Sequence, residues 1–178
     1  MKLNKPKLFD QNWSAIALAT IVLCVFLSIA SPAFMSFTNM QSVLVQASVT
    51  AIMAVGMTYI IIGGGIDISV GAILFFISSV FAQVVVSTDS YTLALVVSVA
   101  AGAVLGAVNG FMAIKFKVTP LITTLATYTI YRGMAIHLTG AQNIPIPREL
   151  GYLGNGSFLG IPVPILLMVL VTILTLMV

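Results

Sequence analysis

The sequence predicts an all-α integral membrane protein, a polytopic helical bundle of about six transmembrane helices. Of its 178 residues, 60% are hydrophobic and only 6% are Asp, Glu, Lys or Arg, whereas about 25% of a typical soluble domain is charged. Apolar stretches long enough to cross the hydrocarbon core recur along the chain. A chain of this composition cannot cover itself with polar side chains, so we expect it in a lipid bilayer.

The same composition argues against several other classes of protein. The net charge is +3, but the basic residues are few, so no nucleic-acid partner is expected. The single cysteine, Cys24, excludes an internal disulfide and has no ligand spacing for zinc; within its apolar run we expect it to be a small buried hydrophobe. His137 is the only histidine, and Asp67 has no acidic neighbour. We therefore expect no catalytic residue, no metal site and no cofactor in this chain.

Six stretches reach or approach the roughly 20 apolar residues that a spanning helix needs. They are Trp13–Ala30, Val43–Ile62, Ser69–Val86, Tyr91–Ile114, Val118–Thr139, and a sixth from Ile161 to Val178. Turn-forming segments separate them: "SPAF" at 31–34, "STDS" at 87–90 and a long segment at 140–160. One alternative for the first stretch is a secretory signal, although its apolar run exceeds the usual h-region of about 7–15 residues.

The positions of the lysines predict the orientation. Lys2, Lys5 and Lys7 precede the first span, and Lys115 and Lys117 follow the fourth. Cytoplasmic loops carry an excess of Lys and Arg, and both clusters agree if the chain starts inside. We therefore expect a cytoplasmic N-terminal tail over 1–12 and an extracytoplasmic loop over 140–160.

The stretch "IIIGGGIDISVG" at 60–71 places three glycines and an acid between two apolar spans. Gly63, Gly64 and Gly65 can adopt backbone angles closed to other residues, and Ser69 is a candidate cap for a helix that restarts at Val70. Two interpretations stand. The stretch is a shaped helix interruption with Asp67 facing a cavity, a partner or water inside the bundle, or it is a cytoplasmic turn with a solvated Asp67.

The segment "GAVLGAVNG" carries a doubled G-x-x-x-G pattern. Gly102, Gly106 and Gly110 form one flat stripe on a helix, which lets another backbone approach closely within the subunit or between subunits. Asn109 lies beside this stripe and is a candidate for a hydrogen bond across helices.

The fifth span carries one broad polar face. Its members are Thr123, Thr124, Thr127, Tyr128, Tyr131 and Arg132. This face either lines a polar path or holds helices together. Arg132 lies roughly 20 Å along the helix from its start, and the alternative for it is an interfacial arginine that reaches lipid phosphate, with Tyr128 and Tyr131 as belt residues.

Several of these motifs, in this order, resemble one known family. "SVTAIMAVGMTYIIIGGGIDISVGAIL" (48–74) resembles the second and third spans of permease subunits from sugar ABC importers of the ribose and autoinducer-2 type. "NGFMAIKFKVTPLITTLATYTIYRGMAIHLTG" (109–140) and "LGIPVPILL" (159–167) resemble the family's following segments. The resemblance covers the chain from about Met40 to its end.

The resemblance implies a function that the spacings alone do not show. It implies a single transmembrane permease domain that pairs with a second permease subunit, identical or different, in the bacterial inner membrane. Cytoplasmic ATP-binding subunits hydrolyse ATP, and an extracytoplasmic sugar-binding protein delivers a monosaccharide or similar polyol. The permease itself is then no enzyme. The family continues into a cytoplasmic segment resembling G-R-x-x-x-A-x-G-x-N-x-x-A-A, so we expect this chain to be an N-terminal portion.

With this family in view, we favour the break as part of the substrate pathway. The pathway residues expected on this basis are Gly64, Gly65, Asp67, Ser69, Asn109, Thr127 and Arg132. A self-contained channel or secondary transporter is the main alternative, since discontinuous helices with an intramembrane charge occur there too, but such folds usually show a second, matching break. A membrane enzyme would need paired carboxylates or histidine clusters.

Overall fold

The structure is a computed structural model that describes residues 11–147 and 151–177. Within them it contains seven helices and one short β-hairpin. The helices are α1 (Gln11–Ala30), α2 (Phe37–Ile62), α3 (Val70–Thr88), α4 (Tyr91–Phe116), α5 (Pro120–Thr139), α6 (Tyr152–Asn155) and α7 (Val163–Leu176), and the strands are β1 (Ser157–Phe158) and β2 (Ile161–Pro162). The expected basic cluster at Lys2, Lys5 and Lys7, and most of the 1–12 tail, lie outside the described residues.

Each of the six expected spans corresponds to one helix. Three helices of the described chain are long and apolar enough to cross a membrane: α2, α3 and α4. Shorter apolar helices cover Ser14–Ala30 and Val163–Leu176, and α5 is long but more polar. The prediction of an all-α, multi-pass membrane protein is confirmed, with six as an approximate number of spans.

The chain forms two compact units that divide between Gln46 and Ala47, inside α2. In the first unit, α2 begins at Phe37, six residues before the predicted start at Val43, since 43 − 37 = 6. Ser36 explains the early start, because its Oγ accepts a hydrogen bond from the Asn39 N–H at 3.3 Å, as an N-cap does. Cys24 on α1 is exposed in this structure, so the expectation of a buried thiol is wrong.

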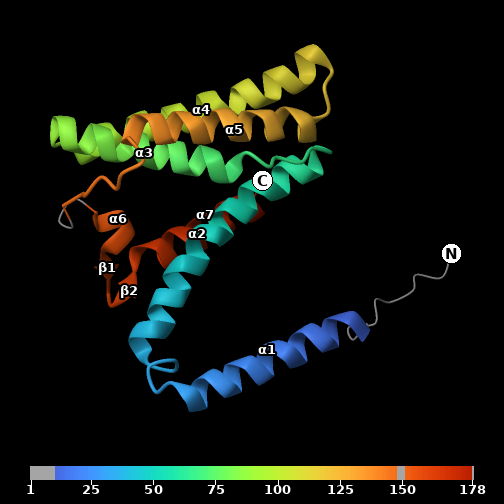
Figure 1. Cartoon of the computed structure of the whole chain (residues 1–178). Coiled ribbons are helices and arrows are strands. Elements are labelled where there is room, and N and C mark those ends of the chain that lie inside the picture. Colours follow the sequence, from blue (N-terminus) through green and yellow to red (C-terminus); the bar gives the residue numbers. More distant parts are fainter. Residues whose placement is uncertain (1–10, 148–150, 178) are drawn as a thin grey trace. The chain divides into compact units, whose positions relative to one another are not determined.

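In the second unit, α3, α4 and α5 pack side by side (Figure 1). Their core centres on Ala72, Leu105 and Tyr131. Small residues at the contacts bring the helices close together, which is typical of membrane bundles: the buried Ala82, Ala94 and Ala135, and Ser98, whose hydroxyl donates to the Ile77 carbonyl at 3.3 Å.

The segment between α5 and α7 contains structure that the sequence pattern did not predict. The strands β1 and β2 pair antiparallel, with Ser157 opposite Pro162. Leu159 and Gly160 connect them, and both have positive φ, +53° and +81°, as a type I′ turn requires. Elsewhere in this unit, the Tyr59 hydroxyl on α2 donates to the Thr175 carbonyl on α7 at 3.2 Å.

Candidate functional site

The three glycines end helix α2. The Gly65 N–H donates to the Ile60 carbonyl and the Gly64 N–H to the Ile61 carbonyl, both at 2.9 Å. Gly64 is left-handed, with φ +78°. This pair of bonds around one left-handed residue is a Schellman motif, which satisfies the last carbonyls of a helix. The break is therefore a capped helix end rather than a frayed one.

Asp67 lies just before the next helix, α3, and contacts its N-cap residue. Its Oδ1 accepts hydrogen bonds from the Ser69 N–H at 2.7 Å and from the Ser69 hydroxyl at 2.6 Å. A carboxylate is favourable here because a helix N-terminus is partly positive. Ser69 stands at the N-cap position as expected, but its side chain makes no capping hydrogen bond. Asp67 instead holds the N-cap residue through its N–H and its hydroxyl, and the same hydroxyl accepts a hydrogen bond from Asn109.

A chain of hydrogen bonds joins this helix start to α4 and α5. The Asn109 Nδ2 donates to Ser69 Oγ at 2.7 Å, and the Tyr131 hydroxyl lies 3.1 Å from Asn109 Oδ1 and 3.2 Å from the Leu105 carbonyl. Ser69 is 0% exposed, Tyr131 4% and Asn109 5%. We call Tyr131, Asn109, Ser69 and Asp67 the polar relay. Every link donates toward Asp67, and the chain ends at its Oδ1, which accepts from the Ser69 hydroxyl.

Thr124 fastens the irregular backbone of the break to α5. Its Oγ1 accepts from the Ile68 N–H at 3.1 Å and lies 3.3 Å from the Ile66 carbonyl, to which it donates. Buried backbone groups that lack partners are costly, above all in a membrane protein. One threonine side chain thus satisfies two backbone groups that no regular secondary structure satisfies.

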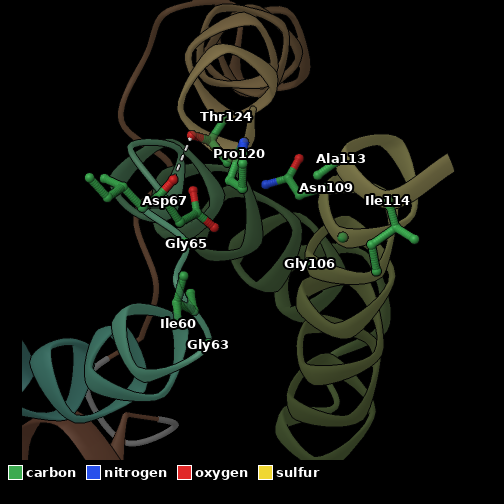
Figure 2. Close-up of a pocket in the computed structure, with 12 residues that line it drawn as sticks. Ile60, Gly63, Gly65, Asp67, Gly106, Asn109, Ala113, Ile114, Pro120 and Thr124 are labelled. Atoms are coloured by element: carbon green, nitrogen blue, oxygen red, sulfur yellow. Dashed lines mark hydrogen bonds between the residues drawn. The ribbon is translucent and has the colours of Figure 1, made fainter. Parts of the chain in front are cut away.

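The break, α4 and the start of α5 enclose a cavity of about 260 Å³, which we call the break cavity (Figure 2). Its polar lining consists of Asp67, Asn109 and Thr124. The other lining residues are apolar or glycine: Ile60, Gly63, Gly65, Ile66, Gly106, Gly110, Ala113, Ile114 and Pro120. No lysine or arginine is among them.

The structure brings most of the expected pathway residues together and separates one. Gly65, Asp67 and Asn109 line the break cavity. Gly64 precedes Gly65 in the chain, and Ser69 is hydrogen-bonded to both Asp67 and Asn109. Thr127 is buried one turn along α5, with its hydroxyl 3.3 Å from the Thr124 carbonyl. Arg132 does not join this group: its side chain is exposed, and its Nη1 lies 3.4 Å from the Tyr128 hydroxyl.

The three glycines of the α4 stripe also differ from one another in their surroundings. A Cβ built on Gly102 would lie 3.7 Å from Ile77 of α3, an ordinary packing contact. Gly106 and Gly110 would meet nothing within 4 Å in the described chain, and both line the break cavity. Within this chain, Gly102 thus packs against a helix while the other two border open space.

The sequence pattern did not show that Tyr131 belongs to the polar relay. One interpretation placed it in an interfacial belt, but it is buried and completes the polar relay. The signal was present: Thr124, Thr127 and Tyr131 follow at i, i+3 and i+7, one stripe of a helix. Among the described residues, no group of three or more His, Cys, Asp or Glu gathers to hold a metal ion.

Comparison with known proteins gives consistent matches. A family model described as "Branched-chain amino acid transport system / permease component" matches residues 39–178. The chain is 39% identical over 156 residues to the ribose import permease protein of Bacillus subtilis, an alignment that covers 86% of this chain and 48% of that protein. It is 36% identical over 170 residues to the ribose import permease protein of Escherichia coli, covering 93% and 52%. It is 34% identical over 155 residues to the L-arabinose ABC transporter permease protein of Azospirillum brasilense, covering 86% and 46%. The chain spans about half the length of the curated relatives it matches, and no solved structure matches it.

Proposed function

The chain belongs to the family described as branched-chain amino acid transport system / permease component, and from this premise we propose that it is a membrane-spanning subunit of an ATP-driven importer. The proposed cargo is a monosaccharide or similar small polyol. The observation that carries this proposal is the 39% identity over 156 residues to a ribose import permease. Relatives whose names specify L-arabinose and D-allose transport support a sugar over an amino acid as cargo.

We further propose that the protein lies in the bacterial inner membrane with its N-terminus in the cytoplasm. Lys115 lies in the last turn of α4 and Lys117 is its C-cap, and cytoplasmic loops are rich in lysine. The break cavity is lined by Ile114 and Pro120, which flank these two lysines. In this orientation the cavity opens near the cytoplasmic side, where an imported solute leaves the membrane.

The proposed pathway contains the residues that gather at the break: Gly64, Gly65, Asp67, Ser69, Asn109 and Thr127. We leave Arg132 out of this group because it lies on the exposed face of α5 with Tyr128. It fits the interfacial alternative, in which a guanidinium reaches lipid phosphate.

The remaining subunits follow from the proposed import cycle. ATP hydrolysis belongs to separate cytoplasmic ATP-binding subunits, since the matched relatives are transport permease components; this chain then needs neither a catalytic site nor a cofactor of its own. An extracytoplasmic binding protein delivers the sugar, and a second permease subunit, identical or different, completes the pathway. Import requires that ATP change the relative free energies of outward-open and inward-open states.

A transport assay in the native host tests this function. Cells that lack the gene, and the same cells carrying it again, are compared for uptake of radiolabelled ribose, L-arabinose and D-allose. We expect uptake of at least one of these sugars to fall on deletion and to return with the gene, and to stop when cellular ATP is depleted. Unchanged uptake of every neutral sugar tested would contradict the proposal. Uptake that survives ATP depletion but needs the proton gradient would favour a secondary transporter instead.

A further inference from the structure

We propose that the break cavity contains a hydroxyl-binding subsite in which the second carboxylate oxygen of Asp67 accepts hydrogen bonds from a small neutral polyol. This inference rests on the proposed function, because it assumes that a polyol passes through the cavity. It goes beyond the proposed function in three respects. It names Asp67 Oδ2 as the binding atom, it makes the solute the hydrogen-bond donor, and it predicts that anionic sugars are excluded.

The two oxygens of Asp67 have different surroundings. Oδ1 already accepts from the Ser69 N–H and the Ser69 hydroxyl. Oδ2 has no protein partner among the described residues, and the half-buried side chain lines the cavity. Figure 2 shows the Asp67 carboxylate and the Asn109 amide turned toward the same hollow. Oδ2 is therefore an acceptor held at the cavity wall without a donor.

The polar relay holds this acceptor in place. Oδ1 receives two short hydrogen bonds, and the hydroxyl that makes one of them is itself held by Asn109 at 2.7 Å. Hydrogen bonds to a charged group are about twice as strong as neutral ones, so the carboxylate orientation is well fixed. A side chain that is already held in place loses little conformational entropy when a ligand binds. Because such entropy losses weaken binding, a fixed acceptor favours a higher affinity.

The shape and charge of the cavity restrict the solute. Its volume of about 260 Å³ lies just under the roughly 300–1,000 Å³ of pockets that hold drug-sized ligands, which suits a monosaccharide. Ile60, Ile66 and Pro120 supply apolar surface for the C–H face of such a ring. A carboxylate without a lining lysine or arginine repels anions, so a phosphorylated sugar should be excluded.

Protection of an introduced cysteine measures occupancy of the cavity directly. Ala113 lines the cavity on α4; Ala113→Cys is introduced together with Cys24→Ser, so that position 113 carries the one thiol of residues 1–178. Alkylation of this thiol by N-ethylmaleimide is timed in membrane vesicles that hold the intact transporter, with ribose, L-arabinose, D-allose or ribose 5-phosphate at matched concentrations. We expect at least one neutral sugar to slow alkylation about threefold or more, and ribose 5-phosphate to leave it unchanged.

Asp67→Asn is the decisive variant because it alters only one atom of the hydrogen-bonding pattern. Its amide oxygen can still accept both Ser69 bonds, while the amide nitrogen replaces Oδ2 and donates instead of accepting. We expect the sugar concentration for half-protection to rise on the order of tenfold, which corresponds to the loss of one hydrogen bond to a charged group. Asp89→Asn is the matched control: it makes the same substitution at the exposed C-cap of α3, outside the residues that line the cavity, so half-protection should not move.

The outcomes separate the subsite from the proposed function. If uptake is intact but Asp67→Asn retains full protection, or if ribose 5-phosphate protects as well as ribose, the subsite is wrong while the importer stands. If neither uptake nor protection responds to any neutral sugar, the proposed function fails first. The phosphate comparison uses no change at Asp67, so it remains decisive even if the Asp67→Asn protein does not reach the membrane.

Discussion

Replacing Gly64 with alanine should destabilise the protein, whereas the same change at Gly56, inside the preceding helix α2, should not. A Cβ at either position would meet nothing within 4 Å, so neither substitution creates a clash. The two glycines differ in backbone conformation: Gly56 lies in the interior of α2, and Gly64 has φ +78°. This pair therefore isolates the backbone requirement of the break from every packing effect.

The size of the effect follows from the conformations. A left-handed backbone costs an L-residue about 1–2 kcal/mol, and alanine recovers about 0.4–1 kcal/mol of that because it restricts the unfolded chain. Gly64→Ala should thus lower the free energy of unfolding by about 1 kcal/mol. Gly56→Ala should raise it by about 0.5–1 kcal/mol, since glycine weakens a helix interior. The two variants should differ by about 1.5–2 kcal/mol, or roughly ten- to thirtyfold in the unfolding equilibrium.

An SDS titration of the purified protein in mixed micelles, followed by far-ultraviolet circular dichroism, measures this difference. We expect the unfolding midpoints of the two variants to move to opposite sides of the parent protein. Equal shifts, or a more stable Gly64→Ala protein, would show that the chain does not need a left-handed residue there. The Schellman motif at the end of α2 would then be incorrectly assigned.

Three further predictions concern the contacts around the break and the orientation of the chain. Thr124→Val should lower the free energy of unfolding by about 1–3 kcal/mol because it leaves the Ile68 N–H and the Ile66 carbonyl unpaired. Thr129→Val, on the exposed face of α5, is the control and should change the SDS midpoint little. Similar losses of stability in the two variants would argue against the Thr124 contact. Gly106→Ala should raise the free energy of unfolding by about 0.5–1 kcal/mol, since its Cβ has open space; a less stable protein would show that this position of α4 is packed more closely. Lys115 and Lys117 should react with a membrane-impermeant amine reagent only in inside-out vesicles, and labelling in right-side-out vesicles would reverse the proposed orientation.

The helical architecture could be predicted because lipid removes most alternatives. A membrane span must satisfy its own backbone, so length and hydropathy nearly determine a helix. The errors fell where side chains, not hydropathy, set the boundaries. The N-cap at Ser36 starts α2 at Phe37, within a stretch whose polarity suggested a loop. The hairpin at Leu159–Gly160 depends on backbone angles of two residues, which hydropathy does not report.

The residues of the candidate site could be predicted from the sequence better than the contacts between them. The glycines and Asp67 were identified because a helix-breaking residue or a charge is energetically unfavourable within an apolar membrane span. Helical spacing placed Asn109 beside the glycine stripe, but it did not show that the amide reaches Ser69 on another helix. Tyr131 was ambiguous for the same reason: a tyrosine on a polar face suits both a lipid interface and a buried partner. Contacts between side chains of different helices depend on how the helices pack, and this packing cannot be derived from a single sequence.

The polar relay makes separate helices thermodynamically dependent on one another. Because a single carboxylate holds the N-cap residue of α3 and also ends the hydrogen-bonded chain that runs through α4 to α5, the losses of stability from substitutions at these residues overlap instead of adding. A second substitution along the chain should cost less than it does alone, since the first has already released its neighbour. Natural sequence change at these four positions is then expected to be concerted, with one replacement favouring the next.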